Sequence, residues 1–140
     1  MKEVFADTLY WVALVRPADP WRDAAVKATE RLGAIRIVTT EEVLTEALNA
    51  LGSPRHVRQQ AIRMVRRLLD DSGIAVLPQS QTTFLAGVGL FEKRPDKEYS
   101  LTDCISMESM RSLGLTEILT NDHHFTQEDF TVLIVGDDAK

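Results

Sequence analysis

Five short apolar segments alternate with longer segments of helical character along this chain. The apolar segments cover residues 4–6, 35–38, 74–77, 117–120 and 131–135. Each is almost continuously apolar, as expected for a strand that is buried on both faces of a parallel sheet. Strands that alternate with helices build such a sheet with helices on both sides. The sequence therefore predicts an α/β fold, a three-layer α/β/α sandwich around a parallel sheet of about five strands.

Start and stop signals delimit the helices between these strands. Asp19 and Pro20 begin one helix, because Asp is a favourable N-cap and Pro suits the first helical position, and Gly33 ends it. Thr39 and Glu42 have the spacing of a capping box for a helix that runs to about residue 51. Further helices are expected at residues 8–15, 54–71, 81–92 and, with a cap at Ser100 or Thr102, up to residue 113.

The size and composition indicate a single globular domain over residues 1–140. A chain of 140 residues, with 44% hydrophobic and 26% charged residues, can bury one core without disulfides. The apolar run at residues 9–15 is far shorter than the roughly 20 residues that span a bilayer. No secretory signal is recognisable, and the lone Cys104 cannot form an internal disulfide. These features predict a cytoplasmic protein with no membrane association.

Four acidic residues occupy positions from which they can meet at one edge of the predicted sheet. Asp7 directly follows the first strand, and Asp122 follows the fourth strand by two residues. Asp103 lies in the first turn of its helix, and Glu46 lies in mid-helix beside apolar residues, where an unpaired charge is costly. Ligands of open parallel sheets bind beyond the carboxyl ends of the strands. We therefore expect Asp7, Glu46, Asp103 and Asp122 to converge there.

Each of these acids also has a purely structural explanation. Asp7 could be a turn or cap residue, Asp103 could favour its helix N-terminus, and Asp122 could form an Asx-turn. Glu46 could be a solvated helix residue, and Glu42, one turn earlier, competes with it for a place in the site. The joint placement of the acids favours a shared function.

A cluster of carboxylates points to a hard divalent cation. Oxygen ligands without an organised set of Cys or His suit Mg²⁺ or Mn²⁺ rather than zinc or copper. Such an ion polarises a phosphodiester and lowers the pKa of a bound water, which becomes the nucleophile. The formal net charge of −5 is unfavourable for a protein that binds a polyanion. Divalent ions at a carboxylate cluster would offset part of that charge.

The four acids lie in four short segments of the chain, which are residues 5–8 (FADT), 39–46 (TTEEVLTE), 100–104 (SLTDC) and 119–125 (LTNDHHF). These segments resemble motifs of the PIN domain family, and of its VapC-type toxins in particular. Their order and intervals match along almost the whole chain, and none of the four acids is missing. Glu46 matches the family interval better than Glu42 does.

The resemblance implies a PIN-like α/β/α fold and an Mg²⁺- or Mn²⁺-dependent endoribonuclease that hydrolyses RNA with a metal-activated water. It implies that the four acids are the catalytic metal ligands and that Thr8 and Thr120 give them polar support. It also implies an RNA substrate, a small antitoxin partner and a homodimer, as in a toxin–antitoxin pair.

Arginines on the helix at residues 54–71 form a second candidate surface. Arg55, Arg63, Arg66 and Arg67 fall within an arc of about 120°, opposite the apolar side of that helix. They could contact RNA phosphates, an acidic partner or only solvent.

Other residues near the acids have less specific interpretations. His123 and His124 lack a partner at metal-ligand spacing, so a surface or supporting role is expected for them. Glu128 and Asp129 are expected to be exposed acids, one of which could reach the metal site through a water molecule. The aromatic residues near the start of the chain are expected to pack in the core or an interface rather than stack on bases: Tyr10, Trp11 and Trp21.

Three functions are compatible with the sequence. A metal-dependent ribonuclease requires all four acids, which are present. A non-catalytic PIN-like module that binds RNA or protein would usually lack one or more of them. A phosphotransfer enzyme with Asp7 as an aspartyl nucleophile would need a second nearby Asp, which the sequence Asp7-Thr8-Leu9 does not offer. The ribonuclease is the interpretation that the sequence favours.

Overall fold

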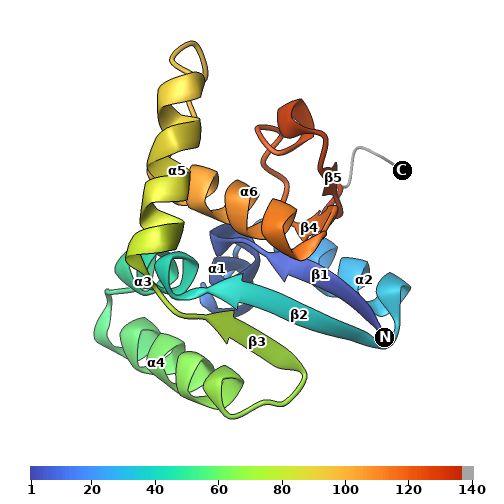
Figure 1. The fold of residues 1–140 in the computed structure, drawn as a ribbon. Helices are drawn as coiled ribbons and strands as arrows, with labels where there is room; N and C mark the ends of the chain where they lie inside the picture. Colours follow the sequence, from blue (N-terminus) through green and yellow to red (C-terminus); the bar gives the residue numbers. More distant parts are fainter. Residues whose placement is uncertain (137–140) are drawn as a thin grey trace.

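A computed structural model describes residues 1–136 and confirms the α/β/α sandwich (Figure 1). Five parallel strands form one sheet in the order β3-β2-β1-β4-β5. The strands are β1 (Lys2–Ala6), β2 (Ile35–Thr40), β3 (Ile74–Leu77), β4 (Glu117–Leu119) and β5 (Thr131–Val132). The helices are α1 (Thr8–Val15), α2 (Arg22–Leu32), α3 (Glu41–Ala50), α4 (Arg55–Leu69), α5 (Gln81–Lys93) and α6 (Leu101–Leu113), with a 3₁₀ turn η1 (Thr126–Glu128).

The helices divide between the two faces of the sheet. On one face α1 contacts α2, α3 and α4, and α4 also packs against β3. On the other face α6 crosses the sheet and pairs with α5, which stands away from the strands (Figure 1). Right-handed crossovers produce this division, because the chain steps outward from β1 to β3 and then returns across the sheet to β4.

The return of the chain creates a topological switch point between β1 and β4. β1 is the central strand, and Phe5 pairs with Val38 of β2 on one side and with Ile118 of β4 on the other. Asp7 and Thr120 are the residues that directly follow β1 and β4. Ligands of open α/β sheets bind at such a point. The topology therefore places the first acid where a ligand is expected.

Two element boundaries differ from the sequence prediction. α2 begins at Arg22 rather than at residue 20, because the Asp19 carboxylate accepts a hydrogen bond from the Trp21 backbone N–H at 2.8 Å and closes a turn before the helix. β5 is shorter than the predicted residues 131–135, because the Ile134 N–H bonds to the Thr120 carbonyl at 3.1 Å. That bond comes one residue too early for a regular ladder, so the strand pairing stops.

The predicted capping box at the start of α3 is wrong. The N-cap is Thr40, whose hydroxyl accepts a hydrogen bond from the Val43 N–H at 3.1 Å. Thr39 is buried in β2, donates to the Ala6 carbonyl at 2.9 Å and accepts from Trp11 Nε1 at 3.2 Å. Both threonines are buried, but the Thr39 hydroxyl is already bonded to Ala6 and Trp11, so the Thr40 hydroxyl caps the helix instead.

The core lies between the sheet and the helices on both faces. Phe5 of β1 and Met107 of α6 are fully buried, and Phe125 anchors the loop after β4. Tyr10 and Trp11 of α1 are buried as expected, with their rings 4.9 Å apart in an edge-to-face arrangement. Within residues 1–136, no helix combines the length and the apolar character that a bilayer crossing needs.

Gly87 permits the close approach of α5 to α6. A Cβ atom at this position would collide with the Ile105 side chain and lie 3.2 Å from the Ile105 backbone N and Cα. We expect Gly87→Ala to destabilise the fold by about 1–3 kcal/mol, because the helices must separate. Gly89→Ala is the matched control, since nothing lies within 4 Å of its added Cβ, and helix propensity should make it stabilising by up to about 1 kcal/mol. Urea denaturation of both variants would measure the two effects, and equal stabilisation by both would contradict the packing argument.

Candidate active site at the carboxyl end of the sheet

Asp7 is a buried acid at the end of the central strand. It occupies the N-cap position of α1, but its side chain makes no capping hydrogen bond. Its Oδ2 accepts a hydrogen bond from the Thr120 hydroxyl at 3.1 Å. Its Oδ1 is buried and has no hydrogen-bond partner among residues 1–136. The capping explanation for Asp7 therefore fails, and one carboxylate oxygen is left for a ligand.

The environment of Asp7 disfavours its charged form. Burial, followed by repulsion from Asp103, raises the pKa of Asp7 from 3.8 to about 7, and the charge of Glu46 adds to this effect. Hydrogen bonds from the Thr8 backbone and the Thr120 side chain act in the opposite direction. A bound cation would relieve this unfavourable charge.

Thr120 links the ends of β1 and β4. Its buried hydroxyl donates to Asp7 and accepts from the Asp122 N–H at 3.2 Å. Asp122 then forms the Asx-turn considered above, because its Oδ1 accepts a hydrogen bond from the His124 N–H at 2.9 Å. The turn does not remove Asp122 from the acidic cluster, since its charge contributes to raising the pKa of Asp103.

Asp103 combines a structural role with a place in the cluster. It forms a capping box with Ser100 at the start of α6, with bonds of 3.0 and 3.1 Å. Burial is the main cause that raises its pKa, and the charges of Asp122 and Glu46 raise it further. The helix-start explanation for Asp103 is therefore correct but incomplete.

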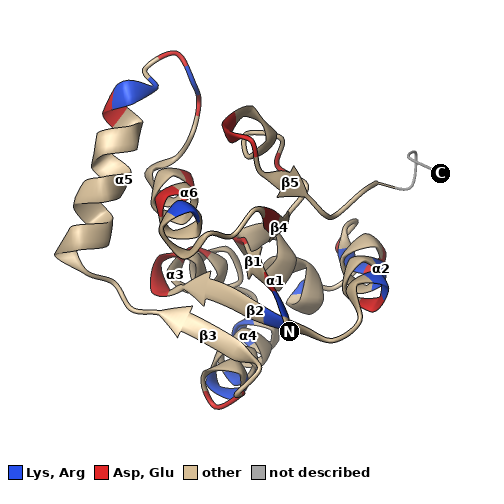
Figure 2. Cartoon of the chain, turned by 45° about the vertical axis from the view of Figure 1, so that its right-hand side comes forward, with Lys and Arg blue, Asp and Glu red and all other residues tan. Residues whose placement is uncertain are grey.

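Glu46 approaches the other acids from α3. Its side chain is half-buried, and Oε1 accepts a hydrogen bond from the Thr8 hydroxyl at 2.5 Å. Its charge acts on both Asp7 and Asp103. α3 also contacts α6, and Figure 2 shows acidic segments on both helices. These observations favour Glu46 over Glu42 as the member of the acidic cluster. The capping role predicted for Glu42 is wrong, because the N-cap of α3 is Thr40.

His124 is closer to the acids than the sequence suggested. Its Nδ1 lies 3.4 Å from Asp122 Oδ1 and 3.7 Å from Asp103 Oδ2. One donor atom from each of these three residues lies within 4.8 Å of the others. The sequence feature that could have placed His124 near the acids is the Asx-turn of Asp122, because such a turn fixes the residue two positions later. The carboxylates and this imidazole, with unpartnered buried atoms on Asp7 and His124, fit a divalent cation.

Glu128 is buried, so the prediction that it is an exposed acid is wrong. Asp129 is exposed as expected. Glu128 is only 7% exposed and accepts hydrogen bonds from Arg94 at 2.9 Å, Arg111 at 2.7 Å and the Tyr99 hydroxyl at 2.9 Å. Burial raises its pKa, but these hydrogen bonds outweigh that effect and lower the pKa to about 2. Glu128 therefore fixes the loop after β4 against α6.

The arginines predicted to form a basic surface are exposed on α4, apart from the four acids. Figure 2 shows basic segments on this helix, on the side of the sheet away from α5. Arg63 and Arg67, with Arg22, line a cavity of about 380 Å³ beside Leu14 and Val15. Those two residues form the last turn of α1, about 10 Å along the helix from the Asp7 end.

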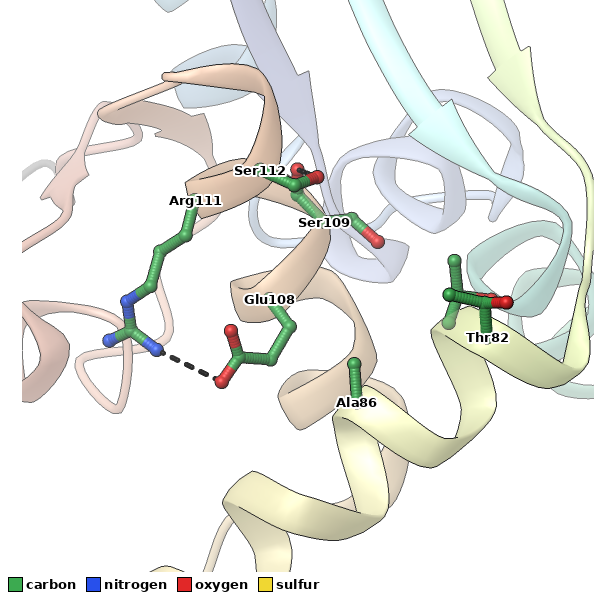
Figure 3. Close-up of a pocket in the computed structure, with 7 residues that line it drawn as sticks. Thr82, Ala86, Glu108, Ser109, Arg111 and Ser112 are labelled. Atoms are coloured by element: carbon green, nitrogen blue, oxygen red, sulfur yellow. Dashed lines mark hydrogen bonds and ion pairs between the residues drawn. The ribbon is translucent and has the colours of Figure 1, made fainter.

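Two further cavities lie outside the group of acids. One of about 410 Å³ lies between α5 and α6, where Figure 3 shows Thr82 and Ala86 opposite Glu108 and Ser109. It is formed by the later turns of α6, whereas Asp103 lies in the first turn. Another, of about 620 Å³, is lined by residues that include Trp21, His123 and Phe130. Trp21 is thus half-buried rather than part of the closed core.

Solved structures share this fold. VapC20 of Mycobacterium tuberculosis, described as a toxin that cleaves the sarcin-ricin loop, superposes with a TM-score of 0.81 at 21% identity, covering 91% of this chain and 96% of that chain. FitAB bound to an IR36 DNA fragment gives a TM-score of 0.66 at 16% identity, with 92% of each chain covered. FitAcB from Neisseria gonorrhoeae gives 0.62 at 15% identity, covering 93% of this chain and 96% of that chain.

Sequence comparison gives a more direct assignment. No curated protein sequence matches the chain significantly. The family model described as PIN domain, however, matches residues 4–130. That span includes β2, β3, β4, the later part of β1 and all four acids, and it ends just before β5. The chain belongs to the PIN domain family.

Proposed function

We propose that this protein is a divalent-metal-dependent endoribonuclease and the toxin of a toxin–antitoxin pair. The observation that carries the proposal is the mutual repulsion of four acids beside the switch point, which helps to raise the pKa of the buried Asp7 and of Asp103. Membership of the PIN domain family supports a nuclease. The likeness to VapC20, a toxin that cleaves RNA of the sarcin-ricin loop, supports the choice of RNA as substrate.

In this proposal Asp7, Glu46, Asp103 and Asp122 hold the metal. Bound Mg²⁺ or Mn²⁺ would polarise the phosphodiester and lower the pKa of the attacking water. Thr120 orients Asp7 through its hydroxyl, and Thr8 orients Glu46 in the same way. These hydrogen bonds hold the carboxylates in place before substrate arrives, which reduces reorganisation during the reaction.

The proposed partners are RNA, a small antitoxin and a second copy of the chain, within the cytoplasm. The antitoxin partner follows from the proposed toxin role, which the likeness to the toxin VapC20 supports. The exposed arginines of α4, namely Arg55, Arg63, Arg66 and Arg67, suit RNA phosphates or an acidic partner segment. Phe84, Leu85 and Phe91 of α5 are about half exposed, at 47%, 56% and 50%, and this apolar surface supports a homodimer.

Replacement of Asp103 by Asn tests the proposed activity. The amide oxygen of Asn can still accept the Ser100 N–H, so the cap and the fold should persist. We expect wild-type protein to cut total RNA only with Mg²⁺ or Mn²⁺, and Asp103→Asn to lose at least about a hundredfold in rate. Mapping of new RNA ends, with unfolding curves as the control for folding, would measure both.

Two outcomes would separate the alternatives. Cleavage that persists in purified Asp103→Asn would remove the assignment of the site. Tight RNA binding by the wild-type protein without any cleavage, in the presence of either ion, would favour a non-catalytic PIN-like binding module.

A further inference from the structure

The imidazole of His124 faces the acidic cluster in a fixed orientation. The Asx-turn bond from its own N–H to Asp122 Oδ1 sets the backbone, and the neighbouring Phe125 is fully buried. The ring packs against the Tyr99 ring, with centroids 5.3 Å apart and planes at 58°. The Tyr99 hydroxyl is in turn held by Glu128 at 2.9 Å. The backbone bond and the Tyr99 ring therefore hold Nδ1 toward Asp103 and Asp122.

Nδ1 of His124 has no hydrogen-bond partner among the described residues, although it is buried. Its distances of 3.4 Å to Asp122 Oδ1 and 3.7 Å to Asp103 Oδ2 are longer than ordinary N–H···O bonds of about 2.7–3.2 Å. A buried polar atom without a partner destabilises a fold, so a ligand at this atom would be favourable. Two carboxylate oxygens and a nitrogen lone pair around one point form a donor set for a cation.

We propose that His124 is a nitrogen ligand of the divalent ion and that it makes the site prefer Mn²⁺ to Mg²⁺. This inference rests on the proposed function of the four acids. Mg²⁺ prefers oxygen ligands and sheds water reluctantly, whereas imidazole is a good ligand for first-row transition metals. A site of carboxylates alone lacks this source of selectivity, so the preference depends on one residue.

The neighbouring histidine provides a matched control. His123 is exposed and lines the separate cavity with Trp21 and Phe130. Replacing it removes an imidazole from the same loop without touching the group formed by Asp103, Asp122 and His124.

Metal titration of the metal-free protein tests the proposal without any assay of activity. Calorimetry would give the affinities of Mn²⁺ and Mg²⁺ for wild type, His124→Ala, His124→Asn and His123→Ala. We expect His124→Ala to weaken Mn²⁺ binding about tenfold or more while Mg²⁺ binding changes by less than about threefold. His124→Asn places a side-chain amide near the position of Nδ1 and should bind Mg²⁺ normally without the preference for Mn²⁺. His123→Ala should behave as wild type.

Pulsed electron paramagnetic resonance gives a direct signature of the ligand. Mn²⁺ bound to wild type or His123→Ala should show coupling to a ligand nitrogen, and this coupling should vanish in His124→Ala. Absence of the coupling in wild type, or equal losses of Mn²⁺ and Mg²⁺ affinity in His124→Ala, would overturn the role of His124. The Asp103→Asn variant tests the acidic metal site separately from the role of His124. If this variant binds both ions as tightly as wild type, the proposed metal site itself is wrong.

Discussion

Asp7→Asn is expected to abolish RNA cleavage and, in metal-free buffer, to raise the stability of the folded chain. Cleavage should fall by more than about a hundredfold, because loss of a direct metal ligand exceeds the 10–100-fold effects seen for residues behind the ligands. Stability should rise at pH 8 by about 2 kcal/mol, since the variant removes a buried charge that burial and Asp103 disfavour. The amide oxygen can still accept the bond from Thr120.

The pH dependence of this stabilisation has a defined sign. The pKa of Asp7 is about 7 in the folded chain and 3.8 as the ordinary value, so the folded state binds the extra proton between these pH values. The penalty is therefore largest above pH 7 and declines as the pH falls toward 4. Urea denaturation of both proteins in chelator at pH 8 and pH 5 would measure it. If Asp7→Asn is less stable than wild type at pH 8, burial and Asp103 do not disfavour the charged form of Asp7 as proposed.

Glu128→Ala is expected to destabilise the fold by several kcal/mol through loss of one buried carboxylate. The substitution removes the buried carboxylate that accepts hydrogen bonds from Arg94, Arg111 and Tyr99. Breaking a buried ion pair by removal of one partner costs about 3–5 kcal/mol. Because the two arginine side chains are each 37% exposed, we expect a loss at the lower end of this range, about 3 kcal/mol. Urea denaturation at pH 7 would measure the loss.

Acid should erase most of this difference between Glu128→Ala and wild type. The pKa of Glu128 is lowered from 4.5 to about 2, so its stabilisation is present above pH 4.5 and disappears as the pH falls toward 2. Glu117→Ala is the control, because Glu117 pairs with the half-exposed Lys2 at 2.6 Å, and such pairs contribute less than about 1 kcal/mol. Equal losses in the two variants would contradict the special role of Glu128.

The sheet and the four acids could be predicted because their signals are local. Each strand is a short apolar run, and the rule that parallel strands share a carboxyl edge places Asp7 and Asp122 at the same end without any knowledge of packing. A polar environment for Glu46 could be inferred because a charge beside buried Val43 and Ala47 needs a partner. The identity of that partner, Thr8, could not be inferred, because it lies 38 residues away in the sequence.

The burial of Glu128 and the closeness of His124 to the acids depend on contacts between distant segments. Glu128 has the local sequence of an exposed turn, and its burial follows from Arg94, 34 residues earlier, and Arg111, 17 residues earlier. His124 has no partner at helical spacing, because its neighbours Asp103 and Tyr99 come from α6 and from the segment just before it. A structural role also does not exclude a functional one: Asp103 caps α6 and belongs to the acidic cluster at the same time.

The most direct test of the central claim is anomalous X-ray diffraction from crystals of the protein soaked in Mn²⁺. We expect an anomalous peak bounded by the carboxylates of Asp7, Glu46, Asp103 and Asp122, with metal–oxygen distances of about 2.0–2.3 Å. The peak should be lost in Asp7→Asn crystals under the same conditions. No peak among these acids at an Mn²⁺ concentration that supports RNA cleavage, or a peak bound only elsewhere, would contradict it.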